Sequence, residues 1–278
     1  MLWPAVGFTK AGVIDYYARI ADAILPHLRD RPLTLKRYPD GVEAQSFYEK
    51  RCPSHRPDWV ATAPVWSGRN EGDIDYCLCN DRATLIWMAQ LAALELHPSL
   101  SLADEIERPS VLAFDLDPGE PAGILECCRV GLRLRELLGE LDLECVPKSS
   151  GSKGLQVYVP LNVETTYEQT KPFAHAVAQT LERAEPDLVV SRMAKKLRKG
   201  KVFVDWSQND QHKTTVNVYS LRAKARPTVS TPVAWEEVEG CRHEADLRFE
   251  QGDVLERVER DGDLFAPVLT LVQELPRF

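Results

Sequence analysis

The sequence predicts a mixed α/β (α+β) fold. Helical and strand-like hydrophobic patterns alternate along all 278 residues, which is typical of domains that combine sheets with helices. No internal repeat, low-complexity tract or Gly/Ser-rich linker interrupts the alternation, so nothing in the sequence marks a clean domain boundary. A hydrophobic content of 44% in a chain of this length is enough to bury a substantial core.

The N-terminal part of the chain predicts two helices with strands between them. Thr9 can cap a helix that runs to about Leu28, because apolar residues recur there at helical spacing. Asp81 can cap a second helix, ATLIWMAQLAALEL, which we expect to end near His97 and Pro98. Strands are expected between these helices at residues 33–38, 58–65 and 74–79.

The central part of the chain predicts a second sheet. It begins with the apolar run VLAFDLD, which Pro118 and Gly119 stop. We expect strands at 111–117, 143–148, 155–161 and 202–206, helices at about 121–139 and 166–185, and a tight polar loop, SSGSKG, at 149–154. Residues 214–221 predict a further strand that pairs with 202–206, and the remainder predicts a helical, peripheral tail.

The compartment predicted from the sequence is the cytoplasm. No apolar run is long enough to span a bilayer, and the N-terminal residues lack the features of a secretory signal, so no membrane partner is expected. The seven cysteines are odd in number and include no C-x-x-C pair. This spacing fits neither a disulfide framework nor a zinc ribbon and favours buried, reduced thiols.

Charge is distributed unevenly along the chain. The net charge of −8 argues by itself against nucleic-acid binding, which normally requires a basic surface. Between Arg192 and Arg226, however, ten Lys or Arg residues are opposed only by Asp205 and Asp210. This stretch indicates either one anion-facing surface on an acidic protein or simply a solvated basic face.

Two carboxylates end the apolar strand at 111–117. Asp115 and Asp117 are two residues apart, so on a strand both side chains point to the same face. Two ionised carboxylates at such a place require a cation or hydrogen-bond donors nearby. Oxygen ligands suit Mg²⁺ or Mn²⁺, although a D-x-D pair by itself is more often a pair of surface acids.

A third carboxylate, Asp205, stands in the apolar strand VFVDW. A buried strand rarely carries an unpaired acid. If the two acidic strands are neighbours, three carboxylates converge and can hold two metal ions, the arrangement that polymerases and nucleases use. The competing interpretation is that Asp205 caps the turn formed by the next residues, SQND.

Three further segments have the composition of a nucleotide-binding site. The SSGSKG loop offers backbone N–H groups and the charge of Lys153 to a phosphate, but it is equally a common hairpin loop. Arg222, at a predicted strand end, can clamp a phosphate or remain a surface cation. In residues 35–50, basic side chains alternate with aromatic ones, among them Phe47 and Tyr48, which suits base stacking or a core.

Taken together, these motifs resemble a known family. The segments VLAFDLDPG, SGSKGL, GKVFVDWSQN, YSLRA, LKRYPDGV and ALELHP are similar to those of the polymerase domain of bacterial DNA ligase D and its stand-alone primase-polymerase relatives, in the archaeo-eukaryotic primase superfamily. The resemblance extends from about residue 8 to residue 235. It implies one catalytic domain over 1–278 with two intimately packed modules, roughly 1–105 and 106–235, and a helical C-terminal tail.

The resemblance also implies roles for individual residues. Asp115, Asp117 and Asp205 match the catalytic, metal-binding carboxylates of the family. The positions that contact the incoming nucleotide or lie beside it are Lys36, His97, Ser150, Lys153, Gln156, Gln208 and Arg222. The positions expected to contact DNA are Lys10, Arg37, Phe47, Tyr48 and Lys50, with Phe47 and Tyr48 stacking near the template and Lys10 near a downstream 5′-phosphate.

The fold and activity that the family implies are specific. The fold combines an RRM-like catalytic sheet with a second α/β module. The activity is addition of nucleotides, preferably ribonucleotides, to primer ends at short gaps, with two Mn²⁺ or Mg²⁺ ions per site. The expected partners are gapped or broken double-stranded DNA with a 5′-phosphate, nucleoside triphosphates, a separate DNA ligase and an end-binding protein, in end joining or excision repair at the nucleoid.

Two departures from the family pattern affect these expectations. The family loop usually continues SGSKGLH, whereas this chain has Gln156 at the place of the histidine. Glutamine can donate a neutral hydrogen bond but cannot carry charge, so we expect lower or altered activity. The chain also starts at MLWP, where relatives usually have further N-terminal residues that include another basic contact, so we expect weaker binding of a 5′-phosphate.

Three other functions remain open from the sequence. A metal-dependent nuclease could use the same carboxylates but would have little use for a triphosphate clamp at Lys153 and Arg222. A catalytically weakened module that binds DNA ends or gaps would account for Gln156, although all three aspartates are present. The last alternative is an α/β domain with a structural cation.

Overall fold

The chain folds into two units, and each unit is built from three separate stretches of sequence. The structure is a computed structural model, and it describes residues 1–68 and 70–276. Unit 1 comprises residues 1–106, 214–230 and 249–263, and unit 2 comprises 107–213, 231–248 and the residues from 264 onward. Segments from the C-terminal part of the chain therefore complete both units.

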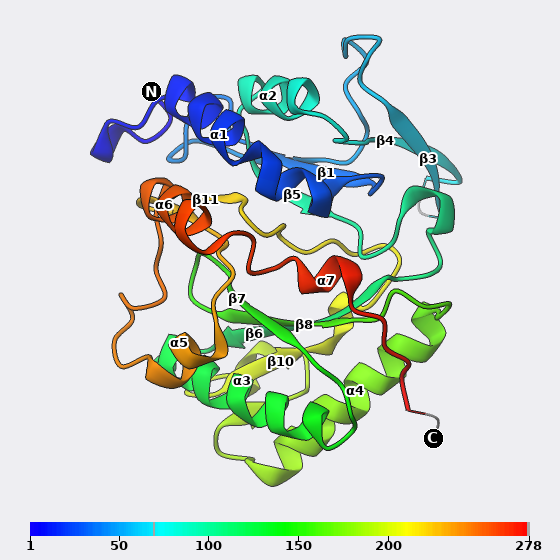
Figure 1. The fold of residues 1–278 in the computed structure, drawn as a ribbon, viewed down its shortest axis with the longest axis vertical. Helices are drawn as coiled ribbons and strands as arrows, with labels where there is room; N and C mark the ends of the chain where they lie inside the picture. Colours follow the sequence, from blue (N-terminus) through cyan, green and yellow to red (C-terminus); the bar gives the residue numbers. More distant parts are fainter. Residues whose placement is uncertain (69, 277–278) are drawn as a thin grey trace. The chain divides into compact units, whose positions relative to one another are not determined.

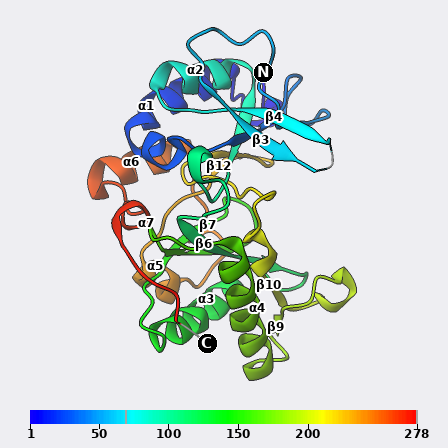
Figure 2. The ribbon, with the colours of Figure 1, turned by 90° about the vertical axis from the view of Figure 1, so that its right-hand side faces the viewer.

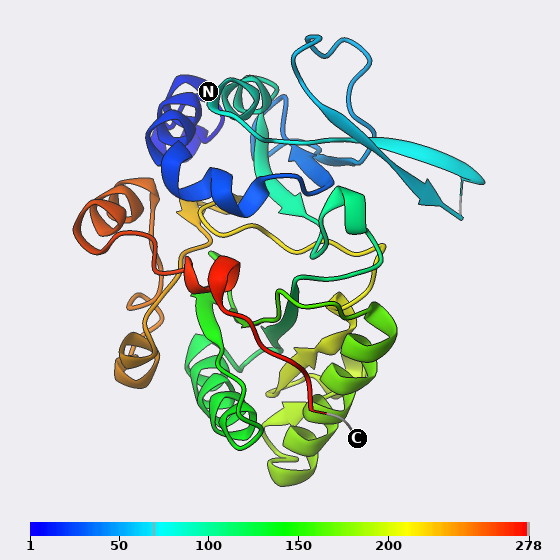
Figure 3. The same cartoon turned by 45° about the vertical axis from the view of Figure 1, so that its right-hand side comes forward.

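Unit 1 contains a five-stranded antiparallel sheet around β1. Its strands are β1 (Leu33–Arg37), β2 (Phe47–Glu49), β3 (Thr62–Ser67), β4 (Gly72–Cys77) and β5 (Ala93–Pro98). The strand β1 pairs with β2, β4 and β5, which places β2 and β5 at its two sides. The β3–β4 hairpin extends away from the rest of unit 1 (Figure 3).

Helices α1 (Lys10–Leu28), α2 (Arg82–Gln90) and α6 (Gln251–Asp261) complete unit 1, with 3₁₀ turns at Pro4–Val6 and Ala103–Glu105. The helices α1 and α2 lie side by side (Figure 1). Thr9 caps α1 by accepting a hydrogen bond from the backbone N–H of Gly12, and Asp81 caps α2 through that of Thr84, so both predicted helix starts are confirmed. Val13, Tyr17, Ile20 and Ile24 form the buried face of α1.

The predicted end of the second helix is wrong. The helix ends at Gln90, and residues 93–98 of its expected C-terminal part form β5, which pairs with β1. Ala92 has a φ of 56°, which ends the helical path. The apolar run has helical spacing, but pairing with β1 stabilises it as a strand. The strand β5 is buried along its whole length, and its backbone groups form hydrogen bonds with β1.

The predicted strand at 214–221 is also wrong. Residues 214–220 are irregular, and only Leu221–Ala223 (β11) forms a strand, paired with Pro227–Val229 (β12). This segment belongs to unit 1 and does not pair with residues 202–206. The backbone of Asn217 instead donates to Leu96 of β5, and Tyr219 has a φ of 63° that interrupts extended geometry.

Unit 2 contains the sheet with order β7-β8-β6-β10-β9, as Figures 1 and 2 show in part. Its elements are β6 (Val111–Pro118), α3 (Ile124–Gly139), β7 (Val146–Ser149), β8 (Leu155–Pro160), α4 (Tyr167–Ala184), β9 (Val189–Val190) and β10 (Val202–Asp205). Apart from the short β9, this is a β-α-β-β-α-β succession, the RRM-like arrangement that the family resemblance implies. The fold-class prediction is confirmed.

The remaining elements of unit 2 are short and helical. They are the 3₁₀ turns Lys195–Leu197 and Trp206–Gln208 and the helices α5 (Trp235–Gly240) and α7 (Pro267–Thr270). The central strand β6 is covered on one side by α3 and α4, and Leu112, Phe114 and Leu116 are fully buried. The acidic end of β6 thus belongs to a strand whose apolar residues are packed in the core.

One prediction about the cysteines is wrong. Cys52 and Cys77 form a disulfide that ties the segment after β2 to β4. An odd number of cysteines without a C-x-x-C pair favours reduced thiols, because it gives no signal for a single bridge. Of the other five cysteines, which are free, Cys145 is half-buried and the rest are buried.

Among the described residues, no helix is both long enough and apolar enough to cross a membrane.

Candidate active site

Asp115 and Asp205 are direct cross-strand partners in the unit 2 sheet. The strand β10 pairs antiparallel with β6, and in this register Asp205 lies opposite Asp115 while Phe203 lies opposite Asp117. Directly opposed residues of an antiparallel pair have neighbouring side chains, and Asp117 follows on the same face of β6. The sequence left open whether the two acidic strands are neighbours, and the structure shows that they are.

Asp115 has an unusual protonation equilibrium. The pKa of its carboxyl group is raised to about 6, mainly by burial. The hydrogen bond from Gln156 and the charge of Lys148 lower this pKa, whereas the charges of Asp205 and Asp117 contribute to raising it. Three acidic groups that repel one another in this way provide the ligand type and the negative potential that a divalent cation requires.

The other two carboxylates of the site accept hydrogen bonds from neighbouring residues. Asp117 accepts a hydrogen bond from Arg198 at 3.1 Å, and Asp205 accepts from the side chain of Gln208 at 2.8 Å and from the backbone of Ser207 at 2.9 Å. In the described part of the chain, no three acidic, histidine or cysteine side chains already form a cation-binding group. The carboxylates fit a divalent ion by chemistry and strand register, and a bound ion would take the place of some of these donors.

A row of polar residues crosses four strands at this level of the sheet. The register aligns Asp205, Asp115, Gln156 and Lys148 on β10, β6, β8 and β7. The Gln156 side chain donates to Asp115 at 3.1 Å and accepts from the ammonium group of Lys148, whose side chain is 0% exposed. Gln156, which was predicted to lie at the nucleotide, thus contacts a predicted metal ligand. Neither Lys148 nor Arg198 was predicted as a residue of this site.

The SSGSKG loop joins β7 to β8 and is closed by its own residues. The Ser150 hydroxyl accepts hydrogen bonds from the backbone N–H groups of Ser152 and Gly154, both at 3.2 Å. The Lys153 ammonium lies 2.6 Å from Glu120, in an exposed ion pair. The loop lines a cavity of about 500 Å³ together with residues 120–124 and Arg248. Ser150 and Lys153 therefore lie on a loop that is held by internal hydrogen bonds and that borders a cavity.

A second cluster of predicted site residues forms within unit 1. The Nζ atom of Lys36 and the Nε atom of Arg222 lie 4.0 and 3.3 Å from the carboxylate of Glu95, and the His97 ring lies 3.1 Å from it. The Tyr48 ring packs edge-on against His97. Lys36, His97 and Arg222 come from β1, β5 and β11, so this cluster unites residues that are far apart in sequence.

The predicted DNA-contacting residues occupy the surface of unit 1. Phe47 and Tyr48 are 43% and 59% exposed on β2, so the alternative that they belong to the core is wrong. Arg37 on β1 pairs with Glu49 at 3.0 Å and lies against the Phe47 ring. The predicted contacts Lys10, at the start of α1, and Lys50, just after β2, are both exposed.

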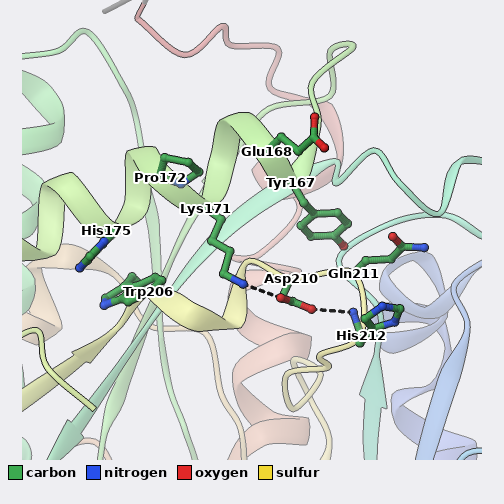
Figure 4. A pocket seen from close by; sticks show the side chains of 9 residues that line it. All are labelled: Tyr167, Glu168, Lys171, Pro172, His175, Trp206, Asp210, Gln211 and His212. Carbon is green, nitrogen blue, oxygen red and sulfur yellow. Dashed lines mark hydrogen bonds and ion pairs between the residues drawn. The ribbon is translucent and has the colours of Figure 1, made fainter. Parts of the chain in front are cut away.

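A further cavity in unit 2 was not predicted. It has a volume of about 460 Å³ and lies between α4 and the segment after β10, as Figure 4 shows. The rings of His175 and Trp206 stack with centroids 3.9 Å apart, and Lys171 pairs with Asp210 at 2.5 Å. Asp210 also accepts from the backbone N–H of His212. No residue that lines this cavity belongs to the predicted site.

Comparison with known proteins decides the family. The model of the family described as "LigD, primase-polymerase domain" matches residues 9–265. The chain belongs to this family. As a LigD primase-polymerase domain it is a nucleotidyltransferase, which confirms the enzyme class expected from the motifs.

Individual relatives agree with this assignment. The chain is 43% identical over 272 residues to the multifunctional non-homologous end joining protein LigD of Mycolicibacterium smegmatis, covering 96% of this chain and 35% of that protein. The bifunctional LigD of Bacillus subtilis is 32% identical over 255 residues, covering 91% and 40%. The chain therefore spans little more than a third of the length of these curated relatives.

A solved structure matches the whole LigD primase-polymerase domain. It is the polymerase domain of Mycobacterium tuberculosis ligase D in complex with DNA, with a TM-score of 0.90 and 38% sequence identity. The match covers 98% of this chain and 96% of that chain. The two-unit fold described above is therefore that of a ligase D polymerase domain.

Proposed function

We propose that this domain adds nucleotides, preferably ribonucleotides, to primer 3′ ends at short gaps or breaks in DNA during end joining or excision repair. The observation that carries the proposal is the register of β6 and β10, which pairs Asp115 with Asp205 and leaves Asp117 beside them. A solved relative is a complex with DNA, and the curated relatives are named end joining proteins. Both support a DNA substrate.

In the proposed reaction, the primer 3′-hydroxyl attacks the α-phosphate of a nucleoside triphosphate and releases pyrophosphate. Asp115, Asp117 and Asp205 would hold two divalent ions, Mn²⁺ or Mg²⁺. Such ions, when bound, lower the pKa of the attacking hydroxyl and offset the charge of the leaving group. The protein fixes the three carboxylates on two paired strands, and Gln156 orients Asp115 by donating to its carboxylate.

We further propose that charged and aromatic groups bind the substrates. The triphosphate contacts would come from Lys36, His97, Ser150, Lys153, Gln208 and Arg222. The exposed rings of Phe47 and Tyr48 offer stacking faces to a template base. Lys10, Arg37, Lys50 and the basic stretch 192–201 would contact DNA phosphates, which makes DNA binding sensitive to salt.

When nucleotide addition has filled the gap, a nick remains, and a DNA ligase must seal it. We propose that the domain works with a ligase activity and with a protein that holds the DNA ends. The names of the curated relatives, which describe multifunctional or bifunctional end joining proteins, support this division of labour.

Primer extension on a gapped duplex tests the proposal. The substrate carries a short gap with a 5′-phosphate, and Mn²⁺ or Mg²⁺ is supplied with ribo- or deoxyribonucleoside triphosphates. We expect template-directed addition, faster with ribonucleotides, and a slower reaction on a duplex without the 5′-phosphate. Shortening of the strand would instead indicate a nuclease, and salt-sensitive gap binding without addition would indicate a weakened binding module.

Gln156→His is expected to raise either turnover or nucleotide affinity, by about tenfold. Gln156 now gives Asp115 one neutral hydrogen bond, whereas histidine can also carry a charge or transfer a proton. The measurement is single-nucleotide addition at several nucleotide concentrations, which separates kcat from KM. Unchanged values of both would show that the glutamine is functionally equivalent to the histidine of the family motif.

A further inference from the structure

Glu95 is a buried acid at the centre of the unit 1 cluster. Its side chain is 2% exposed, yet it lies among groups expected to bind an anion. One carboxylate oxygen lies 3.3 Å from Arg222 Nε and 3.1 Å from the His97 ring. The other accepts hydrogen bonds from the Tyr38 hydroxyl at 3.3 Å and from the backbone of Ala223 at 3.2 Å.

The sheet of unit 1 brings these groups together. Lys36 on β1 lies directly opposite Glu95 on β5, and His97 follows two residues later on the same face. The strand β11 contacts β5 and carries Arg222 and Ala223 to the Glu95 carboxylate. Three cationic or ionisable side chains from three strands therefore share one acidic partner.

The charge state of Glu95 is consistent with a structural link among these side chains. Burial by itself would raise the pKa of Glu95, but the hydrogen bond from His97 and the charges of Arg222, His97 and Lys36 hold it well below its usual range. Glu95 is thus ionised throughout the neutral range. The ionised carboxylate forms an ion pair with Arg222 Nε, and the binding of a guanidinium group to phosphate depends on its orientation.

We propose that Glu95 is a positioning residue, which holds Arg222, His97 and Lys36 in the orientation that binds the phosphates of the incoming nucleotide. The proposal rests on the proposed function of the cluster. The alternative is that Glu95 only balances the positive charge of the cluster. The two roles predict opposite effects of removing the Glu95 charge, because a polyanion binds more tightly to a cluster that has lost a negative charge, but more weakly to one that has lost its geometry.

The test is the affinity of Glu95→Gln for ATP and for inorganic tripolyphosphate in the presence of Mg²⁺, measured by calorimetry. We expect binding of both to weaken by about tenfold, and KM for the nucleotide to rise more than kcat falls. The matched control is Asp263→Asn, which removes another partly buried carboxylate of unit 1, one that accepts from the Tyr219 hydroxyl and lies 2.7 Å from the His27 ring. This control should leave both affinities unchanged.

A double-variant experiment shows whether Glu95 acts through Arg222. In an Arg222→Ala background, Glu95→Gln should have much less effect than in the original protein, because the main group that it positions is absent. Tyr38→Phe removes one hydrogen bond to Glu95 without changing any charge, and should weaken binding in the same direction by a smaller factor. It provides the same test if Glu95→Gln unfolds.

The outcomes distinguish the positioning role of Glu95 from the phosphate-binding role of the cluster. Unchanged or tighter binding by folded Glu95→Gln, or by Tyr38→Phe where Glu95→Gln does not fold, overturns the positioning role. Equal effects of Glu95→Gln with and without Arg222 would also overturn it. If Arg222→Ala itself leaves ATP and tripolyphosphate affinity unchanged, the phosphate-binding role of the cluster is wrong, whatever Glu95 does.

Discussion

Asp115→Asn should reduce nucleotide addition by at least about a thousandfold while leaving the fold intact. Asparagine has the shape of aspartate and can still accept the hydrogen bond from Gln156, so the row across the sheet is preserved. It cannot supply the negative charge that a divalent ion requires. The measurement is primer extension on the gapped duplex, with excess enzyme and long reaction times.

Stability separates this loss from misfolding. Asp115 lies beside Asp117 and Asp205, whose charges oppose its ionisation. Replacing one of three mutually repelling acids by a neutral group should leave the free energy of unfolding of the metal-free protein unchanged or raise it. Thermal unfolding without added metal checks this, and calorimetric titration with Mn²⁺ should show weaker binding by the variant.

Asp210→Asn is the matched control for Asp115→Asn. Asp210 also belongs to unit 2 and is also partly buried, but it pairs with Lys171 and not with the carboxylates of β6. We expect this variant to keep most of its activity. Substantial addition by Asp115→Asn would show that Asp115 is not a metal ligand. Loss of activity in both variants would indicate a general effect of removing acidic residues from unit 2.

The carboxylate site was predictable because it depends on short-range patterns. The apolar run before Asp115 and Asp117 predicts a strand, and the period of a strand fixes their common face. The apolar run before Asp205 likewise predicts the strand β10. Only the pairing of the two strands was left open by the sequence, and the structure provides it.

The unit 1 cluster was harder to predict because long-range pairing creates it. Glu95 and His97 lie in an apolar run whose spacing also fits a helix, and only pairing with β1 makes this run a strand. Arg222 reaches Glu95 from β11, a strand of three residues in a segment predicted to pair elsewhere. Local propensity cannot identify such contacts, because their energy comes from partners distant in sequence.

The ion pair of Arg198 with Asp117 was missed for a similar reason. Arg198 lies in a basic stretch that appears uniformly solvated in the sequence, yet its guanidinium lies 3.8 Å from the centre of the Phe203 ring and its side chain is only 18% exposed. One member of a run of like charges is thus fixed beside a predicted metal ligand. Composition alone does not distinguish it from its neighbours.

Gly154→Ala should destabilise unit 2 by about 2–4 kcal/mol and abolish nucleotide addition. A Cβ atom at this position would lie 2.2 Å from the backbone oxygen of Leu116 on β6, a distance that forces the backbone to move. Gly154 also closes the SSGSKG loop, because its carbonyl oxygen accepts from Ser150 and its N–H donates to the Ser150 hydroxyl. The measurement is the free energy of unfolding in urea.

Gly139→Ala is the control that makes this result specific. A Cβ atom there would meet nothing within 4 Å, and Gly139 is the last residue of α3, so alanine should be neutral or stabilise the protein by about 0.5–1 kcal/mol. If Gly154→Ala proves as stable as Gly139→Ala, the loop tolerates displacement from β6. The Cβ atom would meet Leu116, which lies between Asp115 and Asp117 on β6. A folded Gly154→Ala protein that binds DNA but adds no nucleotide would therefore show that the spacing between the loop and this part of β6 is required for the reaction.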